Sequence, residues 1–183
     1  MKPPKFAGTD SSKPFEYGNQ YDLEEGEGWA RVVIGPNRDH IKVLDTLSDR
    51  WSTPDYFVLY VSLMSHTGKK TGRYQSPMFN KEDLDLFLYT HREFLEGYGG
   101  QHLWVGHPNS GELLVYDHHN LIYAYGNIDS YVQTLEELGF RPGRISIPAP
   151  HTHSFDSHYT QLEDDLFGYF DWTWFPLQDG DDE

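Results

Sequence analysis

The chain has 183 residues, about the length of one domain and enough to bury a hydrophobic core. It contains no cysteine, which excludes disulfides, thiolate catalysis and cysteine-based zinc sites. The formal net charge of −15 repels phosphate backbones, and no apolar run is long enough to cross a bilayer. We therefore expect no nucleic-acid partner, no membrane partner and a cytoplasmic location.

Residues 1–28 are rich in glycine, proline, serine and acids and show no sustained hydrophobic period. They predict a loosely structured acidic N-terminal arm. Residues 29–176 carry the regular patterns and predict a single domain. Residues 177–183 predict an acidic C-terminal tail, since no Lys or Arg follows Arg144.

The hydrophobic period predicts the elements of the domain in chain order. They are a strand over 29–34, a helix over 37–50, a strand over 56–63, a helix over 80–95, short strands over 102–105, 112–116 and 121–125, a helix over 127–138, a strand over 144–147, a short helix over 161–167 and a strand over 170–175. Two of these predicted elements show a characteristic residue pattern. Residues 56–63 are apolar on both faces, as in a central strand, and Asn80 precedes acids that suit a first helical turn.

Strands separated by short turns favour antiparallel pairing, and two amphipathic helices suffice to cover one face of such a sheet. The sequence therefore predicts an α+β domain, a mostly antiparallel sheet with helices packed on one face. A ferredoxin-like split β-α-β unit with added strands is compatible with this order of elements. The last strand ends at Pro176, which places it at a sheet edge.

The densest group of candidate metal ligands follows Pro148 and comprises His151, His153, Asp156 and His158. On an extended segment His151 and His153 point to the same side, so both imidazoles can reach one ion. Neutral imidazole suits zinc and other divalent transition metals, and the carboxylate and third imidazole complete a ligand set. The alternative is a proline-bounded surface loop whose histidines pack against neighbouring side chains.

A second group, Asp117-His118-His119-Asn120, lies between two predicted strands. A solvated hairpin turn is the expected interpretation, with Asn120 in the left-handed conformation. The position of this turn beside strand ends leaves open that one histidine, such as His118, joins the group around His151.

No motif identifies a reaction: for example, the chain has no Gly-x-Ser-x-Gly elbow. The charge favours a non-enzymatic interaction domain, an inhibitor-like or immunity-like binder of a basic protein. The alternative is a metal-dependent enzyme or metal-binding protein that uses His151, His153, Asp156 and His158, with zinc as the cofactor. A third hypothesis is a homo-oligomer formed through the C-terminal edge strand around Trp172 and Trp174.

Overall fold

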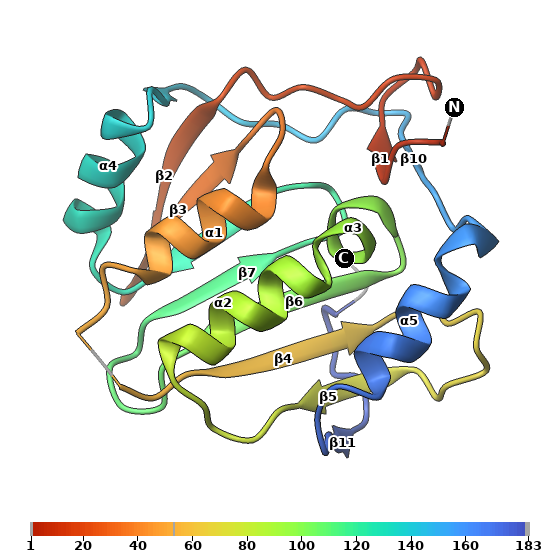
Figure 1. Ribbon diagram of the computed structural model, residues 1–183. Coiled ribbons are helices and arrows are strands. Elements are labelled where there is room, and N and C mark those ends of the chain that lie inside the picture. Colours follow the sequence, from red (N-terminus) through yellow and green to blue (C-terminus); the bar gives the residue numbers. More distant parts are fainter. Residues whose placement is uncertain (1, 53, 182–183) are drawn as a thin grey trace.

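A nine-stranded sheet runs through the middle of the molecule (Figure 1), in a computed structural model that describes residues 2–52 and 54–181. Residues 1, 182 and 183 of the expected arm and tail lie outside the described residues. The strands are β1 (Phe6–Ala7), β2 (Gln20–Gly26), β3 (Trp29–Gly35), β4 (Phe57–Ser62), β5 (Gly72–Gln75), β6 (Gln101–Gly106), β7 (Leu113–Tyr116), β8 (Ile122–Tyr125), β9 (Arg141–Pro142), β10 (Thr152–His153) and β11 (Thr173–Phe175). The large sheet has the order β11-β5-β4-β6-β7-β8-β3-β2-β9, and β1 pairs separately with β10.

Five α-helices lie on one face of this sheet in the described part of the chain (Figure 1). They are α1 (His40–Ser48), α2 (Lys81–Thr90), α3 (Arg92–Gly97), α4 (Ile128–Glu137) and α5 (Thr160–Phe167), and a 3-10 turn (Ser157–Tyr159) precedes α5. Alternate strand residues such as Val58, Tyr60 and Leu103 are fully buried against the apolar sides of the helices. The predicted α+β class, with helices on one face of a mostly antiparallel sheet, is confirmed.

The topology differs from a ferredoxin-like unit. Neighbouring strands of the large sheet are antiparallel except for the β2–β9 pair, and β6, β7 and β8 form a simple meander. The short turns between these strands leave no room for the helical crossovers that a split β-α-β unit needs. The predicted strand over 144–147 is also absent from the described elements, because that segment runs past the sheet without pairing.

The N-terminal 28 residues, expected as a loosely structured arm, contribute β1 and β2. Phe6, Tyr17 and Tyr21 are buried, and β2 pairs along its whole length with β3. Large rings separated by polar residues are enough to anchor a segment that has no obvious period.

The C-terminal tail also returns to the sheet. Asp181 is the one buried residue between Thr173 and Asp181, and its carboxylate pairs with Arg73 of β5. The tail thus crosses the face of the sheet that carries no helices. Among residues 2–52 and 54–181, no helix has the length and apolar character needed to cross a membrane.

Candidate metal centre and adjoining cavity

The turn between β7 and β8 is a compact structure organised by Asp117. The Asp117 carboxylate accepts hydrogen bonds from the backbone N–H groups of His119 and Leu121, both at 2.9 Å. Asn120 adopts the left-handed conformation with φ of 64°, as the sequence predicted, and its side chain accepts a bond from Tyr116. The expectation that this turn is solvated is wrong, because residues 117–120 are all buried.

The N-terminal segment covers this turn and brings β10 to it. Phe6 pairs with His153 across the two-stranded sheet, and the Lys5 carbonyl accepts the backbone N–H of Ser154 at 3.0 Å. The buried Lys5 ammonium donates to the backbone carbonyl of Asp117 at 2.9 Å. Residues far apart in the sequence are therefore fixed side by side by β1.

Three imidazoles meet where the turn and β10 come together. His118, His119 and His153 each offer a ring nitrogen, and these nitrogens lie within 4.8 Å of one another. The ring centroid of His118 lies 4.1 Å from that of His119 and 4.4 Å from that of His153. A tetrahedral ion with metal–nitrogen bonds of about 2.0–2.1 Å needs ligand nitrogens about 3.4 Å apart, so each ring would move inward by no more than about 1 Å to bind it.

The protonation state of the cluster suits metal ligation. Burial, together with the neighbouring His102 and His119, lowers the pKa of His118 to about 2, and burial lowers the pKa of His153 to about 4. Both rings are therefore neutral at pH 7, the form that binds metal. The Nδ1 of His119 donates to the Asp117 carboxylate at 3.1 Å, so Nε2 is the nitrogen that this ring offers to a metal ion.

The structure places the four predicted ligands in two separate regions. His153 lies in the cluster together with His118, and His151 lies beside it, with ring centroids 5.2 Å from His119. Asp156 instead caps the 3-10 turn by accepting the backbone N–H of His158, and the ring of His158 faces Glu93 at 3.5 Å.

The residue pattern singled out His118 but neither His119 nor its hydrogen-bond partner Asp117. The available signal was the run of four polar residues in a turn beside a strand end. Polar turns of this kind are ordinarily solvated, so their composition alone does not indicate a buried cluster.

A cavity of about 470 Å³ lies on the helix-free face of the sheet, next to the histidine cluster. The strand register aligns its walls, because Trp104 pairs with Val115 and Val115 with Tyr123 across β6, β7 and β8. The cavity is lined by Arg31, His102, Trp104, Leu113, Val115, Asp117, Tyr123, Tyr125, Gly180 and Asp181. Its lining therefore combines aromatic rings, the Arg31 cation, the Asp117 carboxylate and the C-terminal tail.

Two buried nitrogens in this lining have no hydrogen-bond partner among the described residues. They are the Nε1 of Trp104 and the Nε2 of His102, both on β6 and two residues apart. Side chains two apart on a strand share a face, so both belong to the face that holds the cavity. A buried N–H without a partner costs about 1–3 kcal/mol and is rare in native proteins.

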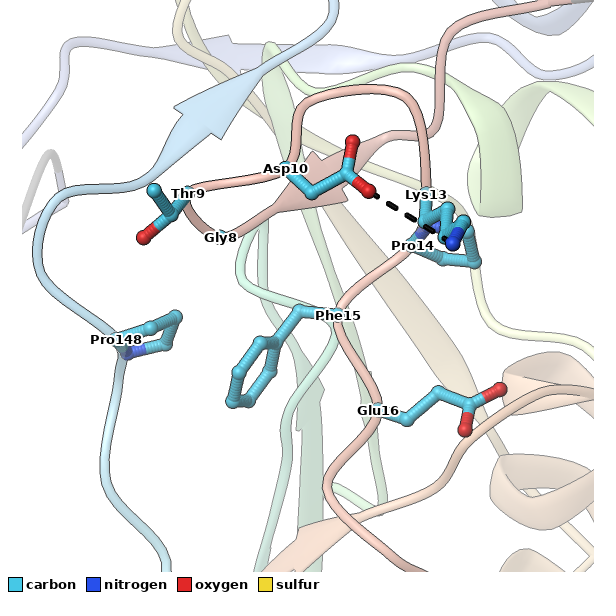
Figure 2. Close-up of a pocket in the computed structure, with 8 residues that line it drawn as sticks. All are labelled: Gly8, Thr9, Asp10, Lys13, Pro14, Phe15, Glu16 and Pro148. Atoms are coloured by element: carbon cyan, nitrogen blue, oxygen red, sulfur yellow. Dashed lines mark ion pairs between the residues drawn. The ribbon is translucent and has the colours of Figure 1, made fainter.

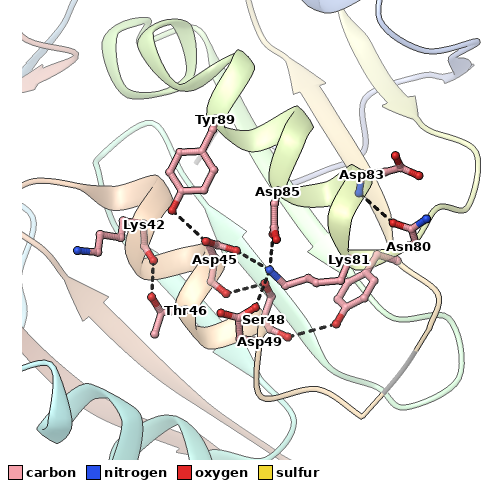
Figure 3. A network of polar contacts seen from close by, with 11 residues as sticks. Lys42, Asp45, Thr46, Ser48, Asp49, Asn80, Lys81, Asp83, Asp85 and Tyr89 are labelled. Carbon is pink, nitrogen blue, oxygen red and sulfur yellow. Dashed lines mark hydrogen bonds and ion pairs between the residues drawn. The ribbon is translucent and has the colours of Figure 1, made fainter.

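Two other groups of polar residues are weaker candidates for a functional site. The carboxylates of Asp45, Asp49 and Asp85 converge between α1 and α2, but the Lys81 ammonium lies among them and contacts all three (Figure 3). A second hollow, of about 460 Å³, lies between the N-terminal segment and Pro148 (Figure 2). Its charged residues are Asp10, Lys13 and Glu16, all exposed, and Asp10 and Lys13 face each other at 3.8 Å.

Comparisons with known proteins give no relative for this chain. No protein-family model matches it, and no curated protein and no solved structure shows a significant match.

Proposed function

We propose that the protein binds one divalent transition metal ion, with zinc as the first candidate, through His118, His119 and His153. The observation that carries this proposal is the convergence of three ring nitrogens within 4.8 Å, on two segments that β1 holds together. Imidazole nitrogen is a preferred ligand of zinc, nickel and copper, and the chain has no thiolate to compete for the ion.

The surroundings of His119 strengthen the proposal. Metal-binding histidines commonly donate their second nitrogen to a carboxylate, which fixes the ring and makes the ligating nitrogen more basic. The hydrogen bond from His119 to Asp117 has this arrangement. His151 is the nearest candidate for a fourth ligand, since its Nδ1 donates to the Pro148 carbonyl and leaves its Nε2 free.

The proposed ion acts as a cross-link between the β7–β8 turn and β10. His118 and His119 are less than a tenth exposed, so the site resembles a closed structural centre more than an open catalytic one. Binding to the folded state alone would add about 2.7 kcal/mol of stability when free metal is a hundredfold above its dissociation constant.

Calorimetric titration of chelator-stripped, tag-free protein with zinc tests this proposal. We expect one equivalent to bind, and we expect His118→Ala with His153→Ala to abolish binding. His158→Ala is the matched control, because His158 lies in the same segment but faces Glu93. Cobalt absorption spectra would report nitrogen ligands directly. Absence of stoichiometric binding by the native protein, or equal binding by the double variant, contradicts the proposal.

A second candidate function is binding of a basic protein, as the net charge of −15 suggests. The β2–β3 hairpin is the favoured surface, because Leu23 and Trp29 are half exposed there among acidic side chains. Glu25→Lys with Glu27→Lys reverses this charge. The variant should lose a salt-sensitive association that the native protein shows, whereas an association indifferent to both salt and charge reversal contradicts this candidate.

A further inference from the structure

The helix-free face of the sheet is divided by the chain's own C-terminal tail. On one side of the tail lies the cavity of about 470 Å³, which Gly180 and Asp181 line. On the other side lies a hollow of about 280 Å³, lined by Arg73 and Gln178 among others. Lifting of residues 178–181 would join these two spaces into one groove.

The tail is held on this face mainly by one carboxylate. Arg73 donates to both oxygens of Asp181, from Nε at 2.8 Å and from Nη2 at 2.6 Å. The backbone N–H of Gln178 donates to the same carboxylate at 2.8 Å. Residues 177–180 are exposed, so little apolar burial opposes release of the tail.

The groove under the tail has the character of a small-molecule site. The volume of the cavity lies in the range of ligand pockets, and Trp104, Tyr123 and Tyr125 supply aromatic walls, with the Arg31 guanidinium 4.5 Å from the centre of the Tyr123 ring. The guanidinium of Arg73 is 5.1 Å from the centre of the Trp104 ring, so the cation and the unpaired Trp104 N–H lie close together. Both are donors, and a carboxylate accepts from two donors at once.

We propose that this groove binds a small planar carboxylate, and that Asp181 occupies the carboxylate position when the groove is closed. Arg73 would exchange the Asp181 carboxylate for that of the ligand, and the Trp104 N–H would gain the partner it lacks. The aromatic body of the ligand would lie along Tyr123 and Tyr125, with the unpaired His102 nitrogen as a second polar contact. Carboxylate binding in this groove requires no metal ion in the histidine cluster.

Because Asp181 and the ligand carboxylate would compete for Arg73, the affinity for the ligand should depend on how often the tail is released. A ligand that binds only the tail-open form is weakened by the fraction of molecules in that form. Replacement of the Asp181 carboxylate by an amide weakens its contact with Arg73, so we expect Asp181→Asn to bind naphthoate about tenfold more tightly than the native protein. Asp179→Asn is the control, because Asp179 is exposed in the same tail.

Calorimetric titration with naphthoate and with the neutral isostere naphthamide, in the presence of a chelator, tests the inference. Arg73→Gln combined with Asp181→Asn keeps the pair neutral, so the variant should fold, and we expect it to lose naphthoate binding. Circular dichroism checks the fold of each variant. The inference fails if Asp181→Asn binds no better than the native protein, if naphthamide binds as well as naphthoate, or if the double variant still binds.

Discussion

Asp117 connects the candidate metal centre to the cavity, because its carboxylate receives the Nδ1–H of His119 at 3.1 Å while Asp117 also lines the helix-free face. Burial opposes its ionisation, but the hydrogen bond from His119 and its neighbours hold the pKa of Asp117 below its ordinary value. The carboxylate is therefore charged at pH 7. It orients one proposed ligand and closes the turn that carries a second.

Asp117→Asn should weaken zinc binding by about 10–100-fold, the usual effect of removing a carboxylate that orients a ligating histidine. The amide keeps an oxygen for the backbone N–H groups of the turn, so the fold should survive. Calorimetric titration gives the affinity. Asp156→Asn is the control, since Asp156 caps the 3-10 turn, and a similar loss in both variants would contradict a specific role for Asp117.

Phe6→Ala should destabilise the protein by about 3–5 kcal/mol, because the side chain is fully buried and leaves a cavity. The Phe6 ring contacts His119, His151 and His153, with centroid separations of 5.3, 5.5 and 5.4 Å. Zinc affinity should therefore fall together with stability. Denaturant unfolding measures the first effect and calorimetry the second.

The control for this variant is Leu23→Ala, whose side chain is half exposed and whose removal should cost under about 0.5 kcal/mol. Equal stability of the Phe6 and Leu23 variants would show that β1 does not hold the site together.

The sequence predicts the parts of the fold that depend on local pattern. The strand around Val58, the helix after Asn80 and the meander from Gln101 to Tyr125 all show the expected alternation or capping. The helix from Asn80 is divided at His91 into α2 and α3. Such elements are stabilised by residues close to one another in the chain.

The candidate site could be predicted only in part, because it depends on distant pairings. β1 and β10 are two residues long and carry no period that predicts a strand. Their pairing places His153 against the β7–β8 turn and buries His118 and His119. Of the four residues that the spacing along 151–158 singled out, His153 lies in the cluster with His118 and His119. The spacing could not show that Asp156 and His158 lie elsewhere.

His91→Phe should make the protein less sensitive to acid. His91 is buried against Phe87 and Tyr169, and burial lowers its pKa to about 4. The unfolded chain has a histidine pKa of about 6.5, so between these values the unfolded state binds more protons and stability falls by about 1.4 kcal/mol per unit of decreasing pH. Phenylalanine binds no proton, so the variant lacks this loss of stability on acidification.

Urea unfolding at neutral pH and at about pH 5 measures the free energy of unfolding of both proteins. Between these two pH values the native protein should lose about 2 kcal/mol more stability than the variant. The neutral measurement is the control, because His91 is uncharged there in the folded state and mostly uncharged in the unfolded state. An unchanged slope of stability against pH would contradict a buried neutral His91.

Gly72→Ala should detach β11 from the sheet. Gly72 has φ of 154°, and an added Cβ would lie 2.2 Å from the Trp174 ring nitrogen and 2.6 Å from the Phe175 carbonyl oxygen. We expect a loss of about 1–3 kcal/mol and faster proteolysis of the C-terminal segment. Gly168→Ala is the control, since its Cβ would meet nothing closer than 3.4 Å. Equal proteolysis of the two variants would contradict this role for Gly72.

Lys81→Gln should make stability depend on divalent cations. The Lys81 ammonium contacts Asp45 at 2.5 Å, Asp49 at 2.7 Å and also Asp85, whose pKa is raised by burial and by the neighbouring Asp45 (Figure 3). Without the ammonium, three carboxylates face one another, and we expect a loss of about 1–2 kcal/mol. Calcium prefers clustered carboxylate oxygens, so millimolar calcium should restore part of this stability.

Thermal unfolding with calcium and with a chelator measures the effect. The native protein is the control, since Lys81 already neutralises the cluster and calcium should leave its midpoint unchanged. If calcium shifts the native protein and the variant equally, the ion acts elsewhere on the acidic surface. A restoration confined to the variant would show that the lysine occupies the position of a cation between α1 and α2.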